Sequence, residues 1–195
     1  MSLHISVRCA LIALILATLA VLFGSTARIR AQTAAGSTAA VFGSPDKRIA
    51  FTPPAGWVRR DTGLPPGTVV VFVAPASAAG RANVSLRAAA FAGDTLPDDL
   101  PRQLAPLLRR EVPGYRCVGG TRIRLRGADG FRMDGVFTVP GAGMAVRNRQ
   151  VFAVNNGRLY IFTFTTDAGN FPATVPAFDR MIGSVRWLPS RTALR

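Results

Sequence analysis

The stretch QVFAVNNGRLYIFTF, residues 150–164, decides the fold class. It predicts a β-hairpin with its turn at Asn156-Gly157, because Asn-Gly is strongly favoured where both turn residues need a positive φ. Side chains alternate along a strand, so this hairpin would carry apolar residues on both faces. One face would hold Phe152, Val154, Leu159 and Ile161, and the other Val151, Ala153, Tyr160, Phe162 and Phe164. Such a hairpin belongs in the middle of a sheet covered on both sides.

The flanking sequence predicts further strands and two helices. Apolar or alternating runs predict strands over residues 49–51, 68–75 and 82–91, and the chain from residue 115 onward predicts a meander of four strands. A leucine stripe after Asp98 and Asp99, which we expect to cap it, predicts a helix disturbed at Pro106. Residues 178–185 predict an amphipathic helix that Pro189 ends. The expected fold class is α+β, an antiparallel β-sheet covered by helices on both faces in an α/β/α sandwich.

The first 31 residues have the layout of a signal peptide with its cleavage region. Arg8 precedes the apolar run CALIALILATLAVLFG, residues 9–24, and small residues follow it. Because this run is near the shortest length that spans a bilayer, an uncleaved anchor is the alternative. We expect a periplasmic or secreted protein, associated with a membrane only if the segment is retained. Residues 32–47 predict a flexible linker, residues 48–188 a single α/β domain and residues 189–195 a basic tail.

Signal cleavage would leave Cys117 as the only cysteine and would remove His4, the only histidine. The mature chain could then form no internal disulfide, no His/Cys metal cluster and no histidine-activated nucleophile, and we expect no metal and no cofactor. Two carboxylates could still act as an acid/base pair. The candidates are Asp61, Asp94, Asp129, Asp134 and Asp167. A carboxylate hydrolase is the minority hypothesis, and we expect a protein that is not an enzyme.

The chain is strongly basic, with 24 Lys+Arg against 10 Asp+Glu and a net charge of +14. Lys47 is the only lysine, so nearly all the positive charge is arginine, either through compositional bias or for bidentate contacts with anions. Nucleic acid is not the expected partner, because no Arg/Lys run, reading helix or aromatic RNA platform is present. For an exported protein we expect an envelope protein or an anionic polymer or lipid surface, with the oligomeric state left open.

The stretch TRIRLRGADGFRMDGVF, residues 121–137, indicates where such a partner would bind. A three-residue loop over residues 128–130, with Gly130 left-handed, would pair Leu125 with Met133 and Arg124 with Asp134. That register gathers arginines on one outer face of the sheet. The partner-binding candidates are Arg122, Arg124, Arg126, Arg132, Arg147 and Arg149. The alternative is a solvated strand face that binds nothing.

The order of these segments resembles the Mog1/PsbP-like family. The resemblance rests on FTPPAGW at residues 51–57, GADGFRMDGVF at 127–137, GRLYIFTFTTD at 157–167 and FPATVPAFDRMIGSV at 171–185, and it covers roughly residues 48–187. The family includes extrinsic subunits of the photosynthetic oxygen-evolving complex, a nuclear protein that binds a small GTPase, and many exported bacterial proteins. The resemblance implies a binding or assembly-assisting module without a catalytic centre. It transfers no functional residue, because no ligand motif matches.

Three hypotheses about function follow. The first is an exported, non-enzymatic binding or assembly-accessory protein of the cell envelope, which uses basic sheet-edge or loop surfaces to contact an acidic macromolecular partner. The second is a carrier or sensor of a small amphipathic or anionic ligand held between sheet and helix. The third is the carboxylate hydrolase. A common fold does not choose among them.

Overall fold

Two antiparallel sheets and two α-helices form the part of the chain that the computed structural model describes, residues 40–75 and 82–189. The larger sheet has seven strands in the order β3-β4-β5-β9-β8-β7-β6. They are β3 (Val58–Arg60), β4 (Thr68–Val73), β5 (Ala82–Ala90), β6 (Arg116–Leu125), β7 (Ala128–Thr138), β8 (Ala145–Asn155) and β9 (Arg158–Asp167). The smaller sheet contains β1 (Phe42–Gly43), β2 (Ile49–Phe51) and β10 (Arg186–Trp187). The helices are α3 (Leu100–Glu111) and α4 (Phe171–Gly183), and the 3-10 helix η2 (Ala168–Asn170) precedes α4.

The β8–β9 hairpin confirms the fold prediction. Asn155 pairs with Arg158, and both turn residues have positive φ, 49° at Asn156 and 68° at Gly157. The two apolar faces separate as expected. Phe152, Val154, Leu159 and Ile161 join one buried cluster, and Val151, Ala153, Tyr160, Phe162 and Phe164 join the other. The hairpin therefore lies inside the sheet, with β5 on one side and β7 on the other.

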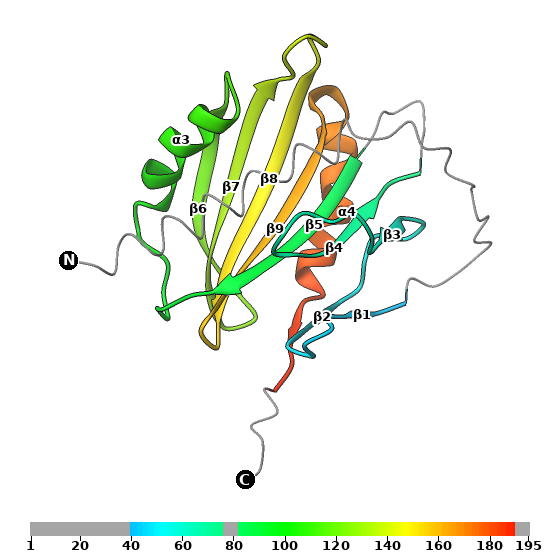
Figure 1. The fold of residues 1–195 in the computed structure, drawn as a ribbon, viewed down its shortest axis with the longest axis vertical. Coiled ribbons are helices and arrows are strands. Elements are labelled where there is room, and N and C mark those ends of the chain that lie inside the picture. Colours follow the sequence, from blue (N-terminus) through cyan, green and yellow to red (C-terminus); the bar gives the residue numbers. More distant parts are fainter. Residues whose placement is uncertain (1–39, 76–81, 190–195) are drawn as a thin grey trace.

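Each face of the large sheet has its own cover, as Figure 1 shows. Helix α3 packs its buried Leu100, Leu104 and Leu108 onto one face. Helix α4 and the small sheet pack onto the other face, where Phe178 and Met181 of α4 meet Phe51 of β2 in a second cluster. We call these the α3 face and the α4 face. The predicted α/β/α arrangement is confirmed. Among the helices that the structure describes, none is long and apolar enough to cross a membrane.

The turn predicted at residues 128–130 is wrong. Leu125 pairs with Ala128, so the turn consists of Arg126 and Gly127, whose φ values are 51° and 87°. Gly130 lies in β7 instead, where a Cβ would stand 2.8 Å from the carbonyl oxygen of Phe152. The guanidinium of Arg126 donates to the carbonyl of Gly183 at the end of α4, where a positive charge is favourable.

The shifted turn changes the cross-strand pairs. Arg124 lies opposite Asp129, whereas the sequence suggested Asp134, and Leu125 does not pair with Met133. The expectation failed because Asp129-Gly130 is a strong local turn signal that competes with Arg126-Gly127, the dipeptide that precedes it. Packing of Gly130 against the neighbouring strand decides between the two.

Two boundary expectations and one helix-capping expectation also need correction. The linker predicted over residues 32–47 is too long, because Phe42 is buried and β1 pairs with β2; residues 32–39 lie outside the described ranges. Helix α4 ends at Gly183, before Pro189, since β10 follows it. Asp99 occupies the N-cap position of α3 but makes no side-chain capping bond, and Asp98 bonds to Arg122. Helix α3 continues through Pro106. The predicted signal peptide, and all but Pro189 of the predicted tail, fall outside the described residues.

The packing of Gly130 gives a test of the β7 register. Gly130→Ala should lower the free energy of unfolding by about 1–3 kcal/mol, because the new methyl group meets a backbone oxygen that cannot move alone. Gly119→Ala is the matched control, since nothing lies within 4 Å of a Cβ there. Urea denaturation of both variants measures the difference, and equal stability would contradict the register.

Candidate functional site

The six arginines singled out from the sequence do not share one face of the sheet. Arg122 and Arg124 alternate with Ile123 and Leu125, which join the cluster on the α4 face, so the two arginines project on the α3 face. Arg132, Arg147 and Arg149 lie on the α4 face, because their strand neighbours Met133 and Phe152 pack with α3. Arg126 is in the turn. The proposed single platform is therefore divided by the sheet itself.

Arg122 braces the segment before α3. Its guanidinium pairs with Asp129, with Nη2 3.0 Å from Oδ2, and with Asp98, with Nη1 2.6 Å from Oδ1. It also donates to the carbonyl of Leu96, whose amide donates to Asp129 at 2.7 Å. Asp129 is only 7% exposed, so these bonds hold a nearly buried carboxylate. Arg122 is committed to the fold, and on the same face Arg124 donates to the carbonyl of Gly127.

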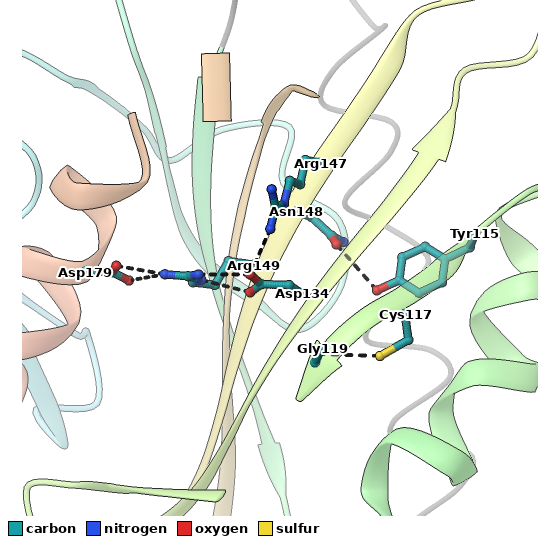
Figure 2. A network of polar contacts seen from close by, with 8 residues as sticks. All are labelled: Tyr115, Cys117, Gly119, Asp134, Arg147, Asn148, Arg149 and Asp179. Carbon is teal, nitrogen blue, oxygen red and sulfur yellow. Dashed lines mark hydrogen bonds and ion pairs between the residues drawn. The ribbon is translucent and has the colours of Figure 1, made fainter. Parts of the chain in front are cut away.

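Arg149 is the centre of the network in Figure 2. It forms a bidentate pair with Asp134, with Nε–Oδ1 at 2.8 Å and Nη2–Oδ2 at 2.9 Å, and its Nη1 donates to both oxygens of Asp179 on α4. The hydrogen bond to Asp134 raises the pKa of Arg149 above its ordinary value, against the opposing effect of burial. The side chain is 13% exposed. Arg149 therefore joins α4 to the middle of the sheet.

Arg147 lies next to this pair and is held more loosely. Its Nη2 is 3.6 Å from Oδ2 of Asp134, and its guanidinium carbon lies 4.2 Å from the centre of the Phe171 ring, within the range of a cation–π contact. The side chain is about one-third exposed. Arg147 thus keeps part of its charge accessible while the ring of Phe171 fixes its position.

The exposed end of the α4 face lies over β6 and β7, where Arg116 and Arg132 are both exposed. Arg116 lies opposite Val136, which lies opposite Arg147, and Arg132 lies between Thr121 and Val151. In the part of the chain that the structure describes, neither Arg116 nor Arg132 makes an ion pair or a side-chain hydrogen bond. We name this area the basic sheet surface; it contains Arg116, Arg132, Arg147 and Arg149 with the carboxylates of Asp134 and Asp179.

This surface continues to an edge of the sheet, because β6 is the last strand in the described order. The edge is irregular, with a register shift between Cys117 and Gly119 that leaves Val118 exposed. Bulges and charged residues are the usual means by which an edge strand avoids pairing with other strands. A partner would therefore meet arginine side chains here rather than a regular backbone edge.

The carboxylates do not assemble as a hydrolase would need. Asp129 faces α3 and Asp134 faces α4, and each is bonded to an arginine. Asp61 pairs with Arg59 in the segment after β3. Among residues 40–75 and 82–189, no group of three or more His, Cys, Asp or Glu side chains could hold a metal ion. Cys117 is a free thiol whose Sγ lies 3.6 Å from the carbonyl of Gly119.

Sequence reasoning missed two members of this site. Arg116 begins β6, and only the exact register shows that it lies on the α4 face with Arg132 and Arg147. Asp179 lies on α4, 30 residues from Arg149, and no local pattern connects the two. The spacing of Arg147 and Arg149 did indicate that they share a face, since residues two apart in a strand do so.

The fold and this surface define a class of protein, a small α+β domain that presents arginines on an exposed part of its sheet. More particularly, the chain has the Mog1/PsbP-like fold. Neither a protein-family model nor a curated protein matches the sequence. The similarity to solved structures, at low identity, shows the fold alone, and at that level it confirms the resemblance found in the sequence.

Three solved structures illustrate the likeness. Cyanobacterial PsbP (CyanoP) from Synechocystis is 18% identical, with a TM-score of 0.58 over 78% of this chain and 95% of CyanoP. LpqN of Mycobacterium tuberculosis, described as involved in cell envelope biogenesis, is 16% identical, with a TM-score of 0.53 over 77% of this chain and 90% of LpqN. The Ran-binding protein Mog1p of Saccharomyces cerevisiae is 8% identical, with a TM-score of 0.54 over 76% of this chain and 94% of Mog1p.

The structure separates a bracing arginine from an exposed one. Arg149→Gln should lower the free energy of unfolding by about 2 kcal/mol or more, because Asp134 and Asp179 lose their strongest donor in a largely buried position. Arg132→Gln, which changes the charge equally on the neighbouring strand, should stay within about 0.5 kcal/mol. Urea denaturation compares the two, and an equal loss of stability in both variants would contradict the distinction.

Proposed function

We propose that the protein is a non-enzymatic binding or assembly-accessory protein of the cell envelope, and that its basic sheet surface contacts an acidic face of a protein partner. The observation that carries the proposal is the exposure of Arg116 and Arg132 next to Arg147, with Asp134 and Asp179 already engaged by Arg149. The surface thus keeps an excess of positive charge directed outward. An acidic partner would supply the missing carboxylates.

The chemistry of arginine suits this role. A guanidinium group presents N–H donors in a planar fork that fits a carboxylate with two parallel hydrogen bonds. Arg116 and Arg132 project from neighbouring strands, so their backbone positions are set before a partner arrives. The Phe171 ring likewise orients Arg147, which limits the side-chain entropy that binding costs. Positive charge on a rigid surface favours rapid and selective encounter with an acidic one.

The place of action in this proposal is the periplasm or the exterior of the cell. The N-terminal sequence has the composition of a signal peptide, which supports export. The involvement of LpqN in cell envelope biogenesis and the Ran-binding role of Mog1p are properties of those two proteins. They support the proposal only by showing that the fold is used for a binding role and in an envelope process.

The test is in-cell crosslinking of the tagged full chain, followed by affinity purification and mass spectrometry. The double variant Arg116→Gln/Arg132→Gln should recover a specific acidic partner at least fivefold less well, because it loses both exposed forks. The control Arg109→Gln/Arg110→Gln removes the same charge from exposed positions on α3, over the other face, and should recover the partner normally.

Two outcomes would overturn the proposal. The first is equal recovery of every partner by the wild type, the Arg116→Gln/Arg132→Gln variant and the Arg109→Gln/Arg110→Gln variant. That result would mean that Arg116 and Arg132 are solvated and bind no partner. Binding of the purified protein to vesicles of anionic lipid, lost in the β-sheet variant while no protein partner is crosslinked, would assign the surface to a membrane. Partner binding should also weaken as salt is raised, because exposed ion pairs are screened.

A further inference from the structure

A second group of basic residues lies at one end of the fold, away from the basic sheet surface. Figure 1 shows that the β6–β7 turn, the β8–β9 turn, the connection between β1 and β2 and strand β10 all lie at the lower end of the view. Each of these segments carries one or two basic side chains. We name this group the basic end: Lys47, Arg48, Arg126, Arg158 and Arg186.

Contacts between the segments hold the basic end together. Oδ2 of Asp46 lies 3.9 Å from Nε of Arg48 and 3.5 Å from Nη1 of Arg158, so it joins the β1–β2 connection to the start of β9. The amide of Leu188 donates to the carbonyl of Arg48 at 2.9 Å, which places the end of β10 beside the same connection. The guanidinium of Arg126 donates to the last carbonyl of α4, shortly before β10. Segments far apart in the sequence therefore present their cations together.

The basic end holds more positive charge than its own carboxylate can neutralise. Asp46 pairs with two of the five cations, so the excess is five minus one, or four charges. In the part of the chain that the structure describes, neither Lys47 nor Arg186 makes an ion pair or a side-chain hydrogen bond, and both are exposed. The sequence that follows, SRTALR at residues 190–195, adds two arginines. An anionic partner would therefore meet accessible cations here.

The surroundings of these cations favour a lipid surface over a protein face. The core of a protein–protein interface is usually apolar. The large apolar side chains that stand exposed on the described residues, Val41, Val58 and Val118, do not belong to the basic end. Trp187 does lie there, half-buried, and its indole N–H donates to the carbonyl of Leu125 at 2.9 Å. A tryptophan ring beside arginines is typical of the boundary between lipid headgroups and water.

We propose that the basic end binds the anionic headgroups of a phospholipid membrane, through the charge of its lysine and arginines. This inference goes beyond the function proposed above, since it adds a second surface with a different partner. The two surfaces lie at opposite ends of α4, because Arg147 packs against Phe171, its first residue, and Arg126 contacts Gly183, its last. The 13 residues of α4 span about 20 Å. A membrane-bound protein would therefore still expose the basic sheet surface to a protein partner.

The test is co-sedimentation of the purified full chain with vesicles of equal parts phosphatidylglycerol and phosphatidylcholine, and with vesicles of phosphatidylcholine alone. The wild type should bind the anionic vesicles more tightly, and raised salt should weaken that binding because exposed charges are screened. Lys47→Gln/Arg186→Gln should weaken it by about tenfold or more, because two accessible cations near the lipid surface are lost.

Two further variants are the controls. Arg116→Gln/Arg132→Gln removes the same charge from the basic sheet surface and should bind the vesicles as the wild type does. Lys47→Arg/Arg186→Lys preserves the charge and should also bind normally, because a headgroup surface responds to charge rather than to the planar fork of one guanidinium. Urea denaturation should show the stability of the wild type in Lys47→Gln/Arg186→Gln, because both residues are exposed.

Three results would overturn the proposal. Equal binding to neutral and anionic vesicles, or no binding to either, would show that anionic headgroups are not recognised. An equal loss of binding in Lys47→Gln/Arg186→Gln and in Arg116→Gln/Arg132→Gln would mean that net charge acts without a defined site. Unchanged binding in Lys47→Gln/Arg186→Gln would exclude the basic end. Crosslinking to an acidic protein partner depends on other residues, so the two proposals can fail separately.

Discussion

The packing of the β8–β9 hairpin on both faces is the constraint on which the other elements depend. Phe152 and Ile161 require cover on one side, and Phe162 and Phe164 require it on the other, so helices or a second sheet must lie above and below. Helix α3 covers the face that carries Phe152 and Ile161, and α4 with the small sheet covers the face that carries Phe162 and Phe164. Polar contacts then hold these layers in position. Arg149 of the sheet bonds to Asp179 of α4, and Arg122 of the sheet bonds to Asp98 in the segment before α3.

This dependence explains which parts of the fold could be predicted from the sequence. The hairpin was predictable because Asn156-Gly157 and the alternation around it are local and agree with each other, and the helices because their apolar stripes have helical spacing. The Arg126-Gly127 turn was not predictable, because Asp129-Gly130 is an equally good local signal. What excludes it is contact with Phe152 on another strand and the bonds of Asp129 to Arg122, which are properties of the folded chain.

The candidate site was predictable only in part for the same reason. Arginines in alternating positions marked the correct strands, but the sequence could not show which charges are neutralised. Asp98, Asp129, Asp134 and Asp179 come from separate segments, and they bind Arg122 and Arg149. Those two arginines are braces, whereas Arg116, which begins β6, contributes to the exposed surface. The positions of the few aspartates therefore decide which arginines stay exposed, and the formal charge of +14 alone does not locate a binding surface.

The distribution of polar groups also differs in kind between the two faces of the sheet. On the α4 face, charged side chains lie toward the β6 edge, where solvent reduces the cost of keeping them ionised. On the α3 face, the buried charges have partners: Arg122 holds Asp129, and Arg87 donates to the carbonyl of Pro66. An ionised group without a partner would be far more costly there. The two faces of one sheet therefore impose different solvation costs on the charged side chains they carry, and these costs decide where an arginine can stay exposed.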